Sequence, residues 1–408
     1  MTGKLNEYAK AIVRVGVNLQ KGGTLVLTCP VECMDFCRMI AEEAYEAGAR
    51  DVVVRWIDDK LSRMKYLHAD ASIFKEFADW LKTFFYEYAD QKAAFVTILA
   101  TDPELLSGVD PDRIRNSSIA SGKALKDFMD MQMRNEIPWC VASVPTPAWA
   151  SKVFPGIPVD EAIDKLWEAI FSAVRVTGDG QVVENWQAHI ARLNERAAIL
   201  NGYQFSKLIY KNSLGTDLSV ELHEKAKWSG VGDMAASGVS FVANMPSEEI
   251  ATLPRKYRVN GTLYASMPLS LDGVVIRDIR FTVKDGKIVE ANAAEGLDFL
   301  LNKLDIDDGA RYFGEVALVP HNSPISDMGI LFYNTLFYEN ASCHFAFGKA
   351  YPSFIDAADI TEDEMAAREA NDSITHVDFM VGTPDLTVTG VTADGQMVTI
   401  LSNGDFVI

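Results

Sequence analysis

The sequence predicts an α/β fold, in which an N-terminal parallel sheet with helices is followed by a mixed α+β domain. In the first half of the chain, short apolar runs typical of buried strands alternate with helix-like stretches. Beyond residue 205, short alternating strands are separated by turn-forming pairs. We therefore expect an N-terminal α/β domain at residues 1–205 and a second domain at residues 206–408.

The expected parallel sheet consists of apolar runs that occur at intervals along the first domain. These runs are residues 24–28, 51–56, 94–100 and 138–144. A helix over about 30–47, ended by Gly48-Ala49, lies between the first two runs, which makes a strand, helix, strand unit with parallel strands. A loop at 155–158 and two further helix-like segments then lead to about residue 202.

The first strand is followed by a turn that could identify a nucleotide site. It reads Thr28-Cys29-Pro30-Val31-Glu32, without a glycine-rich phosphate loop and with an acidic side chain where phosphate needs bare amides. We therefore assign no nucleotide site. Cys29, Cys33 and Cys37 approach a cluster-binding spacing, but we interpret them as small buried residues.

The second domain is expected to be a mixed or antiparallel sheet, because its strands are short and joined by turn signals. These signals are residues 215–217, 260–261, 272–273, 285–286 and 394–395.

Composition and charge restrict the class of protein. The chain has 408 residues, 48% of them hydrophobic, which is enough to bury a sizeable core. Its 57 acidic and 38 basic residues give a net charge of −19, which disfavours nucleic acid and anionic membranes as partners. The N-terminus has no apolar signal region, and the five cysteines are an odd number without a paired framework, so we expect a cytoplasmic protein.

Metal-ligand side chains occur in the last third of the chain. His376 and Asp378 lie in a strand-like run, where residues two apart point to the same face. His344 would join them from a separate segment. The alternative is that such a histidine is a hydrogen-bonded core residue. The chain has only six histidines, at 68, 189, 223, 321, 344 and 376, so carboxylates must supply the remaining ligands.

Two acidic positions are candidates for those carboxylates. Glu315 interrupts the apolar run 312–319, where a carboxylate is costly to bury unless it is paired or bridges two metal ions. Glu248 and Glu249 are adjacent, and the alternative for them is an exposed pair that caps a loop. His189 and His223 lack companions at ligand spacing and are interpreted as structural.

Four motifs occur in order along the chain: NMPSEE at 244–249, GEVALV at 314–319, LFYENASCHFAFG at 336–348 and HVDFM at 376–380. As an ordered set, they resemble the aminopeptidase T/aminopeptidase S family of metallopeptidases, and the resemblance covers essentially the whole chain. Two mild departures are Ser247, where threonine is usual, and Tyr338, where aspartate is usual.

The resemblance implies the site residues. The implied metal ligands are Glu249, Glu315, His344, His376 and Asp378, with Glu339 as a further ligand. Tyr351 matches the catalytic tyrosine, which would donate a hydrogen bond to the developing oxyanion. The motif alone leaves open whether Glu248 or Glu249 is the ligand, although the overall spacing favours Glu249. Glu248 is then the candidate for taking the proton of the attacking water.

The resemblance also implies an activity. The chain is expected to be a metal-dependent aminopeptidase that removes N-terminal residues from peptides through a dinuclear metal centre and a metal-bound water. Two divalent ions are expected, with zinc, cobalt and manganese left open, together with a homodimer and a peptide substrate with a free N-terminus. A dinuclear phosphoesterase and a non-enzymatic small-ligand-binding protein with a structural metal are the alternatives.

Overall fold

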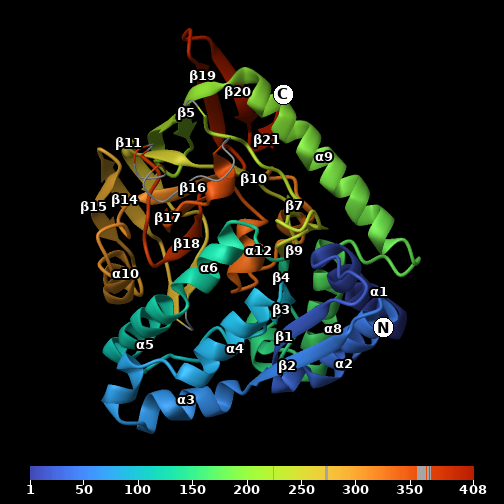
Figure 1. Cartoon of the computed structure of the whole chain (residues 1–408). Helices are drawn as coiled ribbons and strands as arrows, with labels where there is room; N and C mark the ends of the chain where they lie inside the picture. Colours follow the sequence, from blue (N-terminus) through green and yellow to red (C-terminus); the bar gives the residue numbers. More distant parts are fainter. Residues whose placement is uncertain (224, 272–273, 356–363, 365–366, 368) are drawn as a thin grey trace. The chain divides into compact units, whose positions relative to one another are not determined.

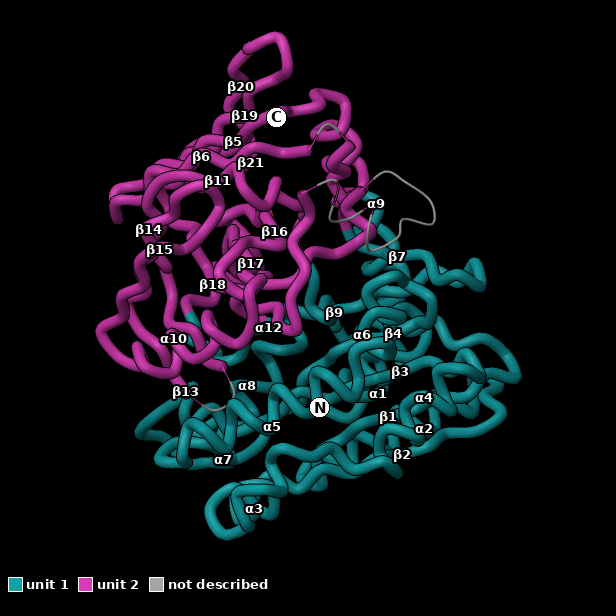
Figure 2. Tube along the Cα trace, turned by 60° about the vertical axis from the view of Figure 1, so that its left-hand side comes forward, with its two compact units in different colours: residues 1–191, 231–247, 330–336 teal, residues 192–230, 248–329, 337–408 magenta. Residues whose placement is uncertain are grey.

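The computed structural model describes the whole chain except residues 224, 272–273, 356–363, 365–366 and 368, and it confirms the predicted α/β class (Figure 1). Two compact units can be separated (Figure 2). The first comprises residues 1–191, 231–247 and 330–336, and the second comprises residues 192–230, 248–329 and 337–408. The units are interleaved along the chain, and the predicted domain boundary near residue 205 stays a prediction.

The first unit contains the predicted parallel sheet. Its strand order is β2-β1-β3-β4-β9, and all neighbours pair in parallel. The four predicted runs correspond to β1 (Thr24–Pro30), β2 (Asp51–Ile57), β3 (Ala94–Ile98) and β4 (Trp139–Ala142). The fifth strand, β9 (Asn244–Met245), comes from much later in the sequence, and its two residues are too few to give a periodic signal.

Apolar side chains of this sheet pack against helices. On one side, Val26 of β1 and Phe95 of β3 share a buried cluster with Phe128 of α6. Elsewhere in the first unit, Tyr8 of α1 stacks on Phe36 of α2 with ring centroids 5.2 Å apart. The helical segments of this unit are α1 (Thr2–Ala11), η1 (Ile12–Gly16), η2 (Val31–Cys33), α2 (Met34–Glu46), α3 (Asp59–His68), η3 (Ala71–Lys75), α4 (Asp79–Asp90), α5 (Pro111–Ala124), α6 (Lys126–Met133), α7 (Pro147–Val153) and α8 (Val159–Ala173).

The carboxyl edge of the sheet is occupied by the chain's own segment 330–336. The indole of Trp149 donates to the carbonyl of Phe332, and Asn334 Nδ2 donates to Ser143 Oγ over 3.4 Å, directly after β4. This edge is where doubly wound sheets bind nucleotides. Cys29, Cys33 and Cys37 are buried free thiols, as the sequence predicts.

The second unit contains an eight-stranded antiparallel sheet of order β15-β14-β11-β6-β5-β19-β20-β21. Its strands are β5 (Phe205–Lys211), β6 (Asp217–Leu222), β11 (Pro254–Tyr264), β14 (Arg280–Lys284), β15 (Lys287–Asn292), β19 (Thr387–Thr392), β20 (Met397–Ser402) and β21 (Asp405–Phe406). The other elements of this unit are β12 (Leu269–Leu271), β13 (Val274–Ile276), α10 (Leu297–Leu304), α11 (Pro324–Asp327) and η4 (Pro352–Phe354). The short strands β7 (Asp233–Met234) and β8 (Ser240–Phe241) belong to the first unit, and the helices α9 (Val182–Tyr203) and α12 (Thr335–Glu339) have residues in both units.

The turn predictions in this unit are confirmed at three places and wrong at one. The signals at 215–217, 285–286 and 394–395 lie where β5 meets β6, β14 meets β15 and β19 meets β20. Asn260-Gly261 instead lies inside β11, because Gly261 faces β6 so closely that a Cβ would lie 2.1 Å from the carbonyl oxygen of Asp217. The signal at 272–273 lies outside the described residues.

The second unit also contains a four-stranded antiparallel sheet, which packs against the eight-stranded sheet. Its strands, in the order β10-β16-β17-β18, are β10 (Ile250–Thr252), β16 (Phe313–Leu318), β17 (His344–Gly348) and β18 (His376–Met380). One face carries phenylalanines that reach the larger sheet. Phe345 of β17 lies 5.1 Å from Tyr210 of β5, and Phe379 of β18 lies 5.1 Å from Phe281 of β14. These aromatic contacts fix the four-stranded sheet on a rigid base.

A bulge at Gly314 decides which way Glu315 points. Phe313 pairs with Phe347, but Glu315 pairs with the next residue, Ala346, so β16 has one extra residue. Without it, Phe313 and Glu315 would share a face. With it, Phe313 joins the aromatic face and Glu315 points to the opposite one.

We predict that Gly314→Ala destabilises the protein by roughly 1–3 kcal/mol, because the added Cβ would lie 2.2 Å from the Lys349 carbonyl oxygen and the bulge would have to shift. Thermal unfolding of the variant checks this. Gly202→Ala in α9 is the control, since nothing lies within 4 Å of its added methyl group and alanine favours a helix. Equal melting temperatures for the two variants would contradict a special role for the bulge.

Candidate metal centre

One face of the four-stranded sheet carries the acidic and imidazole side chains predicted from the sequence. Glu315, Ala346 and Asp378 form one row across β16, β17 and β18. His344 lies in the neighbouring row and pairs with Ala317. His376 is two residues before Asp378 in β18 and therefore faces the same side, as the strand prediction required.

Small side chains separate the functional ones on this face. Ala251, Ala317 and His344 form one row, and Ala346 lies between Glu315 and Asp378 in the next. Alanine at these positions leaves the polar side chains room to converge above the sheet.

The side chains converge into two groups that share Glu315. In the first, Nε2 of His344 lies 3.1 Å from Glu249 Oε2 and 3.8 Å from Glu315 Oε1. In the second, Nε2 of His376 lies 3.3 Å from Glu315 Oε2 and 3.4 Å from Asp378 Oδ1. Within each group, the potential ligand atoms all lie within 4.8 Å of one another. The two oxygens of Glu315 thus face different groups.

Both histidines are oriented by a backbone carbonyl. His344 Nδ1 donates to the Ser342 carbonyl over 3.1 Å, and His376 Nδ1 donates to the Lys349 carbonyl over 2.7 Å. A carbonyl oxygen can only accept, so the proton sits on Nδ1 and Nε2 is left to act as a ligand. This is the arrangement in which metal-ligating histidines are held.

The structure distinguishes the adjacent acids Glu248 and Glu249. Glu249 is two residues before Ala251 and therefore points to the same face of the sheet, where its carboxylate meets His344. Among the described residues, Glu248 belongs to neither ligand group. The alternative of an exposed acidic pair is wrong, because Glu248 is only 5% exposed and Glu249 is partly buried.

Glu339 and Tyr351 also lie close to this cluster. Glu339, at the end of α12, is buried, and burial followed by the charges of Asp378 and Glu249 raises the pKa of its carboxyl well above the usual range. The Tyr351 ring stands edge-on to the His376 imidazole, 4.9 Å away. Burial, followed by the charges of four carboxylates, raises the pKa of Tyr351 well above its usual value, so its hydroxyl keeps the proton at neutral pH.

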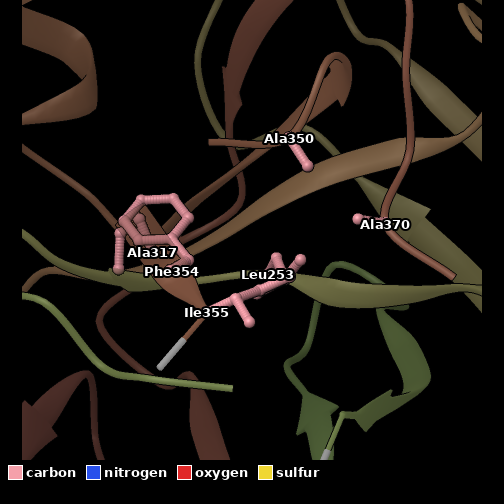
Figure 3. Packing of buried hydrophobic residues seen from close by; sticks show 7 residues of the cluster. Leu253, Ala317, Ala350, Phe354, Ile355 and Ala370 are labelled. Carbon is pink, nitrogen blue, oxygen red and sulfur yellow. The ribbon is translucent and has the colours of Figure 1, made fainter. Parts of the chain in front are cut away.

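An apolar cluster packs against Tyr351. Figure 3 shows the cluster, with its members Leu253, Ala317, Ala350, Phe354, Ile355 and Ala370 labelled. Tyr351 packs against this cluster, and its ring lies 5.6 Å from that of Phe354. The Tyr351 ring therefore contacts both this apolar cluster and the His376 imidazole.

Burial and mutual contact shift the ionisation of the cluster. Burial alone lowers the pKa of His344 and His376, but the neighbouring carboxylates outweigh it and raise both well above the usual range. Burial tends to raise the pKa of Glu315, but hydrogen bonds with both imidazoles outweigh it and lower the pKa to about 2. Burial raises the pKa of Glu249. Without a metal ion, protons bound to these side chains therefore balance the negative charge of the buried carboxylates.

The side chains fit a divalent ion. The donor atoms are imidazole nitrogens and carboxylate oxygens, which suit zinc, cobalt or manganese. The Asp378 Oδ1 atom, although it lies near His376, accepts no hydrogen bond from the described part of the chain. Cys343 offers no ligand to the cluster, since its thiol donates to the Val319 carbonyl over 3.2 Å.

The other histidines lie outside the cluster. His189 contacts the Ser247 carbonyl through Nε2 at 2.7 Å, and His223 Nδ1 accepts from the Lys225 amide. His68 ends α3, and His321 follows β16. None of the four belongs to a ligand group of the described residues.

An α/β protein whose sheet face gathers carboxylates and imidazoles around a shared glutamate is a candidate metalloenzyme. The chain matches the profile of the thermophilic metalloproteases, family M29, over residues 1–406. It belongs to this family, which confirms the resemblance seen in the sequence and implies divalent metal ions and peptide substrates.

Relatives that are named as aminopeptidases align with almost the whole chain. It is 43% identical to Aminopeptidase 2 of Geobacillus stearothermophilus, covering 99% of this chain and 97% of the relative. It is 42% identical to Aminopeptidase AmpS of Bacillus subtilis, covering 99% and 98%. The structure of wild-type AmpT from Thermus thermophilus superposes with a TM-score of 0.91 at 35% identity, covering 99% of each chain.

We predict that the thermal stability of the chelator-treated protein falls as the pH rises from 6 to 8.5. The pKa values of His344 and His376 are raised in the folded state. Their protonation therefore stabilises the folded state fully at a pH below the imidazole pKa of the unfolded chain, about 6.5. This contribution is lost as the pH rises through the higher pKa values of the folded state. The raised pKa of Glu249 acts in the same direction. The lowered pKa of Glu315 matters only below about pH 4.5, outside this window.

Melting temperatures across this range, measured with chelator present, check the prediction. A variant with both His344→Ala and His376→Ala should show a weaker dependence on pH. A pH dependence as steep as in the wild type would mean that other groups control it.

Proposed function

We propose that this protein is a metal-dependent aminopeptidase that removes N-terminal residues from peptides with a free amino terminus. The observation that carries the proposal is the sharing of Glu315 between two ligand groups on one buried sheet face. The relatives named as aminopeptidases support the same activity.

The proposed centre holds two divalent ions. Glu249 and His344 would hold one, His376 and Asp378 the other, and Glu315 would bind both through its separate oxygens. Glu339 is proposed as a further ligand, since its carboxylate lies close enough to Asp378 and Glu249 to be perturbed by their charges. Bound there, divalent ions would supply the Lewis acidity that amide hydrolysis needs at neutral pH. Zinc, cobalt and manganese all suit these ligands.

Tyr351 is proposed to stabilise the transition state. Its phenol stays protonated because burial, and then the surrounding carboxylates, raise its pKa well above the usual value. It can therefore donate a hydrogen bond to the oxyanion that develops as the peptide carbonyl is attacked. Glu248 as the acceptor of the attacking water's proton stays a prediction; among the described residues it belongs to neither ligand group.

The two alternatives have less support. Phosphoesterases hold phosphate with arginine or lysine, whereas the contacts of this cluster are carboxylate–imidazole pairs. A structural metal in a binding protein is closed, usually by thiolates, whereas the side chains here are oxygen and nitrogen donors.

The test of function uses purified protein and paired substrates. We expect release of leucine from leucine amide, none from its N-acetylated form, and no phosphate from an aryl phosphate. The activity should disappear with a chelator and return with zinc, cobalt or manganese. Full activity after verified metal removal would contradict the metal mechanism, and phosphate release alone would favour the phosphoesterase.

In this assay, substitutions distinguish damage to the metal site from a general loss of folding. His344→Ala and Asp378→Ala should each lower bound metal and abolish turnover. The controls His68→Ala and His223→Ala, outside the cluster, should change neither. Equal damage from all four would indicate a general loss of folding.

We predict that Tyr351→Phe lowers kcat by roughly 10²–10³, as expected for the loss of one oxyanion donor, with bound metal unchanged. Phenylalanine keeps the packing against Phe354 and His376 and removes only the hydroxyl. Steady-state kinetics and metal analysis check the prediction together. A normal kcat with normal metal content would remove Tyr351 from the mechanism.

We propose that two copies associate as a homodimer, using an exposed apolar surface of the first unit. Helix α3 has no buried residue, and its Leu61, Met64 and Leu67 are 64%, 56% and 42% exposed. Trp80 of α4 is 72% exposed, and Trp56 of β2, the end strand of the sheet among the described residues, is 44% exposed. Exposed apolar surface of this kind marks protein interfaces.

Sedimentation of the wild-type protein should give the mass of two chains, and a variant with both Leu61→Glu and Met64→Glu should give the mass of one. Met397→Glu, at a methionine of β20 that is 64% exposed, is the control. A wild-type monomer, or a dimer unaffected by the double substitution, would refute this interface.

We also propose a cytoplasmic location, since all five cysteines are free. No described helix could span a membrane.

A further inference from the structure

Asn340 is a fully buried amide between the metal cluster and the loop that carries Glu249. Its exposed fraction is 0%. Its side-chain oxygen accepts from the backbone N–H of Glu248 over 2.6 Å. Its side-chain nitrogen lies 3.4 Å from Glu339 Oε1 and donates to it. One side chain thus contacts two segments that both lead to proposed metal ligands.

The loop before β10 needs such an anchor. Regular pairing of β10 with β16 begins at Ile250, so the preceding residues have no strand partner in this sheet. The bond from the Glu248 amide fixes the Ser247–Glu248 peptide, one residue before Glu249. Glu248 is itself buried, so an unpaired amide there would cost roughly 1–3 kcal/mol.

The contact with Glu339 orients a second carboxylate. Glu339 is the last residue of α12, and the bond from Asn340 restricts where its Oε1 atom can lie. A carboxylate has two oxygens with several lone pairs, so it can accept from an amide and also bind a metal ion. The asparagine amide can do both tasks, because it has an acceptor on one side and a donor on the other.

We propose that Asn340 is a positioning residue of the metal centre. It holds the Glu249 loop and the Glu339 carboxylate at the separation that the ions require, and it acts through these two residues without binding metal or substrate itself. The inference rests on the proposed function, since it assigns Asn340 to the same centre.

The test compares Asn340→Leu, which keeps the branch at Cγ but removes both hydrogen bonds, with the smaller Asn340→Ala. Matched controls are Asn201→Leu and Asn201→Ala. Asn201 also uses both amide atoms, which bond the N–H and the carbonyl of Trp228 at 2.8 Å each. It belongs to neither ligand group of the described residues. Metal-depleted proteins are titrated with Co²⁺, and affinity, visible absorption and melting temperature are recorded.

We expect the Asn340 variants to lose about 10- to 100-fold in Co²⁺ affinity and to change the visible spectrum, as for other partners of metal ligands. The Asn201 variants should lose thermal stability but keep the wild-type affinity and spectrum. Wild-type Co²⁺ affinity and spectrum in either folded Asn340 variant would overturn the proposal, as would an equal loss of affinity in the Asn201 variants. Failure of the wild type to bind Co²⁺ would instead refute the proposed metal centre itself.

Discussion

The proposed site is governed by one constraint: several carboxylates are buried beside one another on a sheet face, and their repulsion and lost hydration must be offset. Glu315 is 4% exposed and faces both imidazoles, while Glu249, Asp378 and Glu339 lie close by. Carboxylates gathered at low dielectric repel one another and lose hydration, so they need positive charge nearby. Protons on His344 and His376 supply it in the metal-free chain, and divalent ions would supply more. The preference for metal follows from the same balance.

The scaffold keeps this charged face in place through an opposite face made of aromatic rings. Phe345 and Phe379 join the four-stranded sheet to the larger one, so the strands cannot rotate without breaking that packing. The bulge at Gly314 lets β16 serve both faces, with Phe313 on one and Glu315 on the other. Rigid strands, rather than mobile loops, therefore carry most of the proposed ligands.

The sequence predicted the parts of the site that depend on local pattern. Period two within a strand put His376 and Asp378 on one side, and the apolar neighbours of Glu315 marked it as an unusual buried acid. The resemblance supplied the complete set of proposed ligands. Local pattern could not supply β9, because two residues have no period, nor the bulge, because Gly314 looks like any glycine in a strand. Asn340 was missed for a similar reason, since its two partners are visible only once the loop at Glu248 and helix α12 are folded together.

The central claim is that Glu315 joins two metal sites on this face. Crystals of the zinc-loaded protein, measured on both sides of the zinc absorption edge, locate each ion directly. The account predicts two anomalous peaks per chain, one between Glu249 and His344 and one between His376 and Asp378, with one oxygen of Glu315 beside each. A single peak, or peaks away from Glu315, would contradict it.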